Sequence, residues 1–190
     1  IADAGIIGLP NAGKSTFLSA TTHAKPKIAD YPFTTLVPNL GVVKIAESEF
    51  VLADIPGLIE GAHEGHGLGD RFLGHVERTS VLLHLLDGTE KDLVQNYKII
   101  REELKQYKLD LVNKPEVVAI NKIDAIDEKE LAKKKKALEK ITKGEVFVIS
   151  AVAHKGVDKV LFALSSEIKK NKKEEQKVEE TNKKWDPLLG

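Results

Sequence analysis

The sequence contains no cysteine, no methionine and a single tryptophan. Without cysteine, disulfides and thiolate metal sites are excluded. Lys and Arg together equal Asp and Glu at 29 each, so no net charge attracts nucleic acid or anionic lipid to the whole surface. No apolar run approaches the roughly 20 residues of a membrane span, and no signal-peptide pattern opens the chain. We therefore expect a cytoplasmic protein without a membrane span.

The composition is that of a globular protein with one well-packed core. The chain has 190 residues, of which 42% are hydrophobic and 31% charged. Because it begins at Ile1, on the threshold of an apolar strand, and has no methionine, we expect a segment of a longer protein. From Asn171 onward the chain is almost entirely Lys, Glu, Gln, Asn and Thr. We expect one domain over residues 1–170 and a charged linker over 171–190, which either stays irregular or extends the last helix.

Apolar strands alternate with amphipathic helical stretches, which predicts an α/β fold with a mostly parallel six-stranded sheet between two layers of helices. The strands are expected at Ala4–Ile7, Gly41–Ile45, Phe50–Ala53, Val81–Leu86, Val117–Ile120 and Val146–Ile149. After the helix that begins near Thr16, further helices are expected at Leu68–Arg78, Asp92–Tyr107, Glu128–Ile141 and Val157–Ile168. The second and third strands are separated by only a few residues, so we expect them to pair as an antiparallel hairpin.

Two stretches show no steady hydrophobic period. Thr21–Asn39 contains three prolines, and Ile55–Gly69 contains five glycines. Loops of this length inside a compact domain are usually functional, and such glycine density suits a segment that changes shape.

The stretch Gly8–Ser15 fits the phosphate-binding pattern G-x-x-x-x-G-K-[ST], with a strand before it and a helix after it. Its glycines allow backbone N–H groups to turn inward around phosphate oxygens, and the helix N-terminus adds further N–H groups. Lys14 can place its charge between the β- and γ-phosphates, and the Ser15 hydroxyl can ligate the bridging magnesium ion. The pattern predicts nucleotide contacts from Gly8, Pro10, Asn11, Ala12, Gly13, Lys14, Ser15 and Thr16. A turn that binds nothing would not account for all eight matching positions.

A D-x-x-G sequence, Asp54–Gly57, follows the third expected strand. Asp54 is placed to hold magnesium through water, and the Gly57 N–H to reach a γ-phosphate. Alone this pattern is weak, because a turn after a strand often looks the same. Its position after a phosphate-binding loop makes it informative.

The sequence Asn121-Lys122-Ile123-Asp124 follows the fifth strand. A carboxylate at Asp124 can accept both the N1–H and the exocyclic amino group of guanine, a pair that adenine does not offer. Asn121 would hold the neighbouring loops and touch the base edge, and the Lys122 stem would lie over the ring. Ser150-Ala151-Val152, after the last strand, would present the Ala151 N–H to the guanine O6.

These four motifs, each at a strand end and in this order, are the signature of a guanine-nucleotide-binding domain, and the sequence resembles translation-factor-related GTPases. Three stretches narrow the resemblance to the Obg family of GTPases: Asp30–Gly41 (DYPFTTLVPNLG), Asp54–Ala62 (DIPGLIEGA) and Gly67–Gly69. The resemblance covers residues 1–170. In that family the domain is flanked by a glycine-rich N-terminal domain and often by a C-terminal one.

The resemblance implies a P-loop NTPase G domain that binds GTP and GDP and slowly hydrolyses GTP to GDP and phosphate with Mg²⁺. It also implies a switch that acts with the large ribosomal subunit, its RNA and protein, in ribosome maturation and in growth and stress control, with guanosine tetraphosphate as a further candidate ligand. The switch segments would be Ile28–Asn39 and Ile55–Gly69.

Carried over by position, Thr35 is the threonine that completes the magnesium shell, and Thr34 takes that place if the register slips by one. Further nucleotide contacts are implied for Phe33, Thr34, Thr35 and Gly57. The expected magnesium ligands are Ser15, Thr35 and Asp54, and the expected catalytic residues are Lys14, Thr35, Gly57 and Asn11.

Hydrolysis is expected to be slow, because Leu58 stands where many GTPases carry the glutamine that orients the attacking water. Asn11 matches the asparagine that helps to hold a potassium ion in related GTPases with a hydrophobic residue at that position, so K⁺ is a candidate activator. Glu60 and Glu64 could instead position water, or could be ordinary surface carboxylates.

Alternatives remain open. A guanine-nucleotide sensor with negligible hydrolysis is favoured by Leu58, whereas an ATPase on the same fold is disfavoured by Asp124. His63 and His66 are expected to be exposed polar residues rather than metal ligands, and His84 a packed strand histidine. Lys133–Lys136 is expected to be a solvated helix face, with a ribosomal RNA contact as the alternative.

Overall fold

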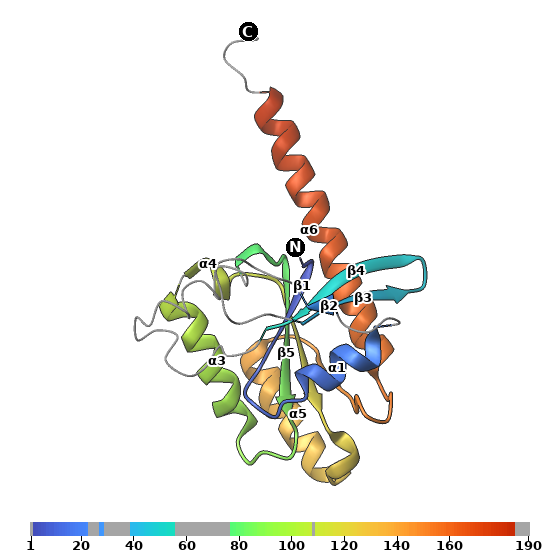
Figure 1. Ribbon diagram of the computed structural model, residues 1–190. Coiled ribbons are helices and arrows are strands. Elements are labelled where there is room, and N and C mark those ends of the chain that lie inside the picture. Colours follow the sequence, from blue (N-terminus) through green and yellow to red (C-terminus); the bar gives the residue numbers. More distant parts are fainter. Residues whose placement is uncertain (1, 23–26, 29–38, 56–76, 108, 185–190) are drawn as a thin grey trace.

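Seven strands form one sheet in the computed structural model, which describes residues 2–22, 27–28, 39–55, 77–107 and 109–184. Their order across the sheet is β2-β3-β4-β1-β5-β6-β7 (Figure 1). The strands are β1 (Ala4–Ile7), β2 (Lys27–Ile28), β3 (Asn39–Ile45), β4 (Ser48–Asp54), β5 (Val81–Asp87), β6 (Glu116–Asn121) and β7 (Val146–Val148).

Five strands, β4, β1, β5, β6 and β7, are parallel. Strand β3 runs antiparallel to β4, which confirms the predicted hairpin, and β2 runs antiparallel to β3. Because the parallel strands end at the same edge, the described parts of the four motifs meet there. The seven residues of β5 are all buried, as expected of a strand that is covered on both faces.

The expectation of a long loop over Thr21–Asn39 is wrong in the parts of that range that the structure describes. Thr22 forms an isolated bridge with Val43, and Lys27 and Ile28 pair with Leu40 and Asn39 to form β2. A two-residue strand is too short to show alternation in the sequence, so no hydrophobic period reveals it.

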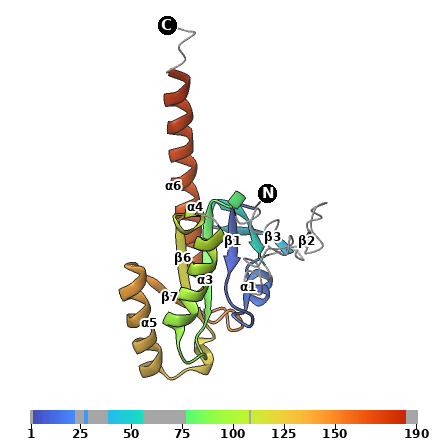
Figure 2. The same ribbon diagram turned by 90° about the vertical axis from the view of Figure 1, so that its left-hand side faces the viewer.

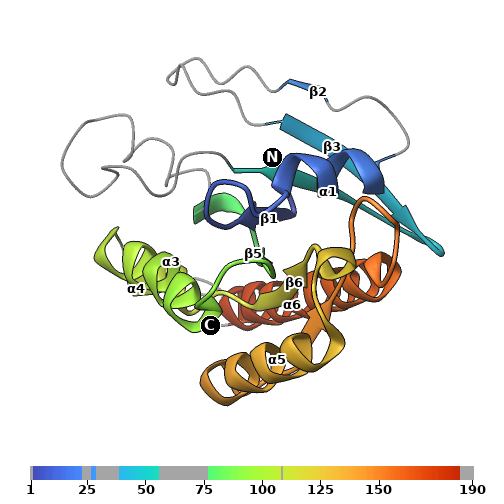
Figure 3. The same ribbon diagram turned by 90° about the horizontal axis from the view of Figure 1, so that it is seen from below.

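Helices cover both faces of the sheet (Figures 2 and 3). They are α1 (Lys14–Thr21), α3 (Leu93–Tyr107), the short α4 (Leu109–Val112), α5 (Glu128–Thr142) and α6 (Val157–Lys184). The apolar sides of α1 and α6 pack into one core, whereas α3, α4 and α5 pack into cores on the other face. The predicted three-layer α/β/α architecture is confirmed. Most of the helix expected at Leu68–Arg78 lies outside the described residues.

Helix α6 continues past the predicted Val157–Ile168 into the charged stretch, which is one of the two alternatives that the sequence left open. Its last buried residue is Ile168, where the hydrophobic period ends, but the helix continues to Lys184 and projects away from the domain (Figure 1). The residues from Lys172 to Lys184 are all exposed. The charged stretch is therefore solvated as expected, and its described part extends the last helix. Trp185 lies outside the described residues.

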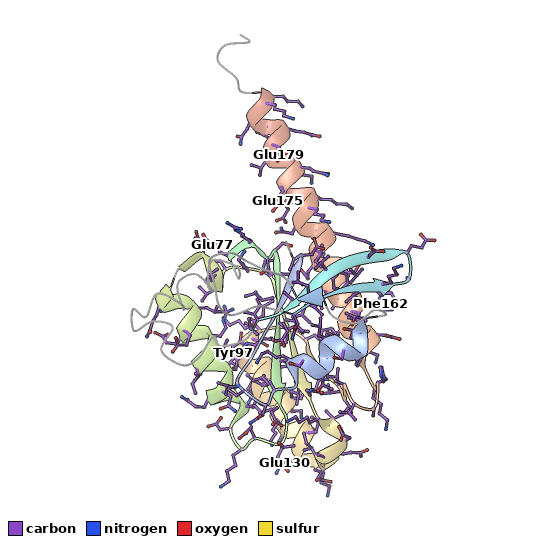
Figure 4. All side chains as sticks on the ribbon, viewed as in Figure 1. Glu77, Tyr97, Glu130, Phe162, Glu175 and Glu179 are labelled. Atoms are coloured by element: carbon purple, nitrogen blue, oxygen red, sulfur yellow. The ribbon has the colours of Figure 1, made fainter. Side chains whose placement is uncertain are left out.

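A buried polar cluster joins β5 and β6 to α3, where Tyr97 projects toward the sheet (Figure 4). His84 is fully buried, as expected of a packed strand histidine, and its Nδ1 lies 2.9 Å from Oε1 of Glu116. Oε2 of Glu116 accepts hydrogen bonds from the Tyr97 hydroxyl (3.0 Å) and from Arg101 (3.1 Å). The Tyr97 ring stacks on His84 with 4.9 Å between centroids. Three side chains thus depend on one carboxylate.

Glu116→Gln should lower the free energy of unfolding at neutral pH by about 3 kcal/mol, because it removes the charge that Arg101 and His84 face. Burial opposes the charged carboxylate, but His84, Arg101 and Tyr97 outweigh it, so the pKa of Glu116 lies below its ordinary 4.5. The stabilisation is therefore complete above pH 4.5 and is lost as the pH falls through the folded-state pKa.

Urea denaturation of the wild type and of Glu116→Gln between pH 7 and pH 3 measures this difference. The exposed Glu145→Gln is the matched control and should change little. A difference that stays constant over the whole pH range would contradict the assignment.

Candidate nucleotide-binding site

The loop between β1 and α1 has backbone conformations that its sequence pattern requires. Gly13 has φ of 92°, and a Cβ there would collide with the Asn121 side-chain amide. A Cβ at Gly8 would collide with the Leu85 carbonyl. Asn11, at φ 70°, is of a residue type that tolerates the left-handed region. Only glycine fits positions 8 and 13, so the loop can turn its N–H groups inward.

Lys14 lies folded over this loop, with its Nζ donating to the Gly8 carbonyl at 3.2 Å. Burial lowers the pKa of Lys14, and the nearby Asp54 charge only partly offsets the effect. A partly desolvated ammonium group gains much from an added negative charge. A polyphosphate held in the loop would supply that charge.

Ser15, in the first turn of α1, lies beside Asp54, the last residue of β4. The Ser15 hydroxyl donates to Oδ2 of Asp54 at 2.9 Å. Asp54 is 6% exposed, and its buried Oδ1 has no hydrogen-bond partner among the described residues. A hydroxyl beside a carboxylate with an unused oxygen offers the hard oxygen donors that Mg²⁺ prefers. These residues therefore fit the expected magnesium ion.

Asn121, at the end of β6, joins two loops through its side-chain amide. Its Nδ2 donates to the Ala12 carbonyl at 3.0 Å, and its Oδ1 accepts from the Ala151 N–H at 3.1 Å. The residue is buried, so both polar atoms depend on these partners. Asn121 thus connects the phosphate-binding loop to the loop after β7, as the sequence led us to expect. Its contact with a base stays a prediction.

Asp124 lies in a short 3₁₀ helix (Ile123–Ala125) and is exposed, but one of its carboxylate oxygens accepts a hydrogen bond from a buried side chain. The Ser150 hydroxyl donates to Oδ1 of Asp124 at 2.7 Å and accepts from the Ala153 N–H at 3.2 Å. Ser150 is fully buried. We therefore expect Ser150 to orient the carboxylate rather than to touch the nucleotide through its hydroxyl.

Asp87, at the end of β5, is a site residue that sequence reasoning missed. Its carboxylate accepts from the Lys122 ammonium at 3.0 Å and from the Thr89 N–H and hydroxyl at 2.9 and 2.6 Å. Burial opposes its charge, but these hydrogen bonds outweigh burial and lower the pKa of Asp87. The sequence did offer a signal: Asp87 is an acidic residue at the end of an apolar strand, and that strand pairs with the one that leads into Asn121 and Lys122.

The remaining expected site residues divide into two groups. Pro10 and Thr16 are exposed on the phosphate-binding loop and the first turn of α1, and Val152 is 77% exposed in the turn after Ala151. The other group lies outside the described residues and comprises Phe33, Thr34, Thr35, Gly57, Leu58, Glu60, His63, Glu64 and His66.

Residues 3–122 match the model of a family described as 50S ribosome-binding GTPase. The chain belongs to this GTPase family. Together with the observed architecture, the match makes the chain a P-loop GTPase G domain, which confirms the fold class predicted from the sequence.

Solved structures with similar folds include Era and FeoB domains. A variant of Era from Aquifex aeolicus, bound to GDP.AlF4-, is 28% identical with a TM-score of 0.67, covering 86% of this chain and 55% of that one. A GDP-bound NFeoB variant from S. thermophilus is 21% identical with a TM-score of 0.67, covering 87% and 62%. The G domain of FeoB from T. maritima is 20% identical with a TM-score of 0.63, covering 88% and 96%.

The chain thus spans less than two thirds of the Era and NFeoB chains and nearly all of the isolated FeoB G domain. The FeoB likeness, at 21% identity or less, shows the fold alone. The GTPase family does not single out the Obg type, so that resemblance enters the proposal below. Among the described residues, no helix is long and apolar enough to cross a membrane.

Asp124→Asn should shift base preference from guanine to xanthine. An asparagine amide can face the xanthine N1–H and 2-carbonyl, but not the guanine N1–H and 2-amino group together. Loss of a charge-assisted pair worth about 3 kcal/mol lowers affinity for GDP about a hundredfold.

Calorimetric titration with GDP and xanthosine diphosphate tests this exchange. The exposed Asp127→Asn, three residues along, is the matched control. An unchanged preference in Asp124→Asn would show that this carboxylate does not face the base.

Proposed function

We propose that this GTPase domain is a slow, Mg²⁺-dependent switch of the Obg type that acts in the cytoplasm with the large ribosomal subunit, in ribosome maturation and in growth and stress control. The observation that carries the guanine-nucleotide part is the Asn121 amide, which joins the phosphate-binding loop to the loop of Ala151. The ribosomal part is supported by the description of the matched family and by the Obg-like stretches of the sequence.

In this proposal the phosphate half of the site is built around Lys14, Ser15 and Asp54. The Lys14 ammonium would exchange the Gly8 carbonyl for the β- and γ-phosphates, and Ser15 and Asp54 would hold the magnesium ion. Bound magnesium would supply positive charge that offsets the charge developing on the phosphates. Thr35 and Gly57 would report the γ-phosphate to the two switch segments.

Slow turnover follows from Leu58, whose aliphatic side chain cannot orient water. Asn11 is exposed at the tip of the phosphate-binding loop, where a potassium ion beside the phosphates would place positive charge. Glu60 and Glu64 remain the alternative means of positioning water.

A second candidate is a nucleotide sensor that distinguishes GDP, GTP and guanosine tetraphosphate, with hydrolysis too slow to matter. The observation that favours it is again Leu58. The paired Ser15 and Asp54 favour the hydrolysing switch, because they provide a magnesium site beside Lys14.

Single-turnover GTP hydrolysis in potassium or sodium chloride, with and without purified large ribosomal subunits, separates the two candidates. We expect a basal rate below about one per second and an increase of about tenfold or more with potassium or with the subunits. Asn11→Gly keeps the left-handed backbone accessible and should remove the potassium effect alone.

A rate that neither potassium nor the subunits change would favour the sensor. Subunits that neither bind the GTP-loaded protein nor alter its turnover would refute the ribosomal part, while GTP binding would still stand.

A further inference from the structure

Lys134, within the basic run of α5, does not behave as part of a solvated face. Its side chain is 12% exposed, compared with 40% for Lys135. Its Nζ donates to the carbonyls of Gly88 and Glu90, both at 2.8 Å, and lies 3.1 Å from a carboxylate oxygen of Glu130. An ammonium group has three donors, and here all three have partners. Glu130, at the start of the helix, is labelled in Figure 4.

The two carbonyls belong to the loop that connects β5 to α3. The Gly88 N–H donates to the Asn121 carbonyl at 2.9 Å, so the loop is also tied to the end of β6. A Cβ at Gly88 would lie 2.8 Å from that same carbonyl, so loop and strand end are in close contact. Any movement of this loop must therefore shift its neighbours at the strand end.

The same loop begins with Asp87, whose carboxylate holds the Lys122 ammonium at 3.0 Å. Lys122 has φ of 66° and precedes the 3₁₀ helix that carries Asp124. A continuous set of contacts thus runs from Lys134 through the loop to Asp87 and Lys122. It ends at the residues expected to cover and read the base.

We propose that Lys134 is a positioning residue for the guanine half of the site, which it supports by fixing the Asp87–Glu90 loop behind Lys122. The inference rests on the proposed guanine-nucleotide function. It assigns a role to a side chain outside the four motifs, on a helix whose basic run otherwise faces solvent. Without this ammonium, two carbonyls lose their donor and Asp87 loses a fixed backbone.

The test compares Lys134→Met with Lys133→Met, an exposed neighbour on the same helix. Affinities for GDP and for inosine diphosphate, which lacks the exocyclic amino group, are measured by calorimetry, and unfolding is followed in parallel. We expect Lys134→Met to weaken GDP binding about tenfold, which is the size of the interaction energy usually measured between residues in contact. We also expect it to reduce the preference for GDP over inosine diphosphate. Lys133→Met should change neither, and Lys134→Arg should restore most of both.

A mutant cycle with Lys122→Met asks whether Lys134 acts through Lys122. If so, adding Lys134→Met to Lys122→Met should have little further effect on GDP affinity. Additive losses would overturn the proposed path, and Lys134→Met with wild-type affinity and preference would overturn the proposal. A loss of GDP and inosine diphosphate binding in equal proportion, matching the unfolded fraction, would show a purely structural role.

If Lys134→Met does not fold, Lys134→Gln gives the same readouts, because glutamine retains a hydrogen-bond donor and is a good helix former. Failure of the wild type to bind GDP would refute the proposed function itself. Unchanged binding in the variants beside a binding wild type would refute only this inference.

Discussion

The side-chain amide of Asn121 is the contact on which the arrangement of the site depends. Its Nδ2 donates to the Ala12 carbonyl and its Oδ1 accepts from the Ala151 N–H. Because the side chain is buried, water cannot replace either partner. A buried polar group that loses its partner costs about 1–3 kcal/mol, which is enough to favour one relative placement of the two loops strongly. The distance between the phosphate-binding loop and the loop of Ala151 is thereby set before any ligand arrives, which lowers the cost of ordering them on binding.

The sheet makes that contact possible, and charged groups behind it complete the site. Strands β1, β4, β5, β6 and β7 end at one edge. Asp54, Asp87 and Asn121 are the last residues of β4, β5 and β6, and Gly8 and Ser150 come shortly after β1 and β7. Three residues expected to face the ligand have a partner that directs them: Asp54 for Ser15, Asp87 for Lys122, and Ser150 for Asp124. At the other end of β6, the Glu116 carboxylate likewise contacts several side chains. In the Asp87 and Glu116 clusters alike, one carboxylate holds several neighbouring side chains.

Much of this could be predicted from the sequence, because apolar runs of strand length end in recognisable motifs. Asp54, Asn121 and Asp124 were predicted as site residues in that way, and the hairpin of β3 and β4 was predicted and is confirmed. The parts that escaped prediction have no local signal. The two residues of β2 cannot show a period. The helical extension to Lys184 was one of two alternatives, because the charged stretch has no apolar face that decides between them. Asp87 and Lys134 act on residues 35 and 46 positions away. A lysine in a basic run looks solvated until the loop beneath it is placed.

The central claim is that one site binds a polyphosphate and, at the distance set by Asn121, selects guanine as the attached purine. Equilibrium titration of the purified chain with GDP, GTP and ATP in the presence of Mg²⁺ tests it most directly. The account predicts saturable binding of both guanine nucleotides and a preference over ATP of about a thousandfold or more, because adenine leaves the Asp124 carboxylate without its paired donors. Equal affinity for ATP, or no binding of GDP and GTP at millimolar concentrations, would contradict it.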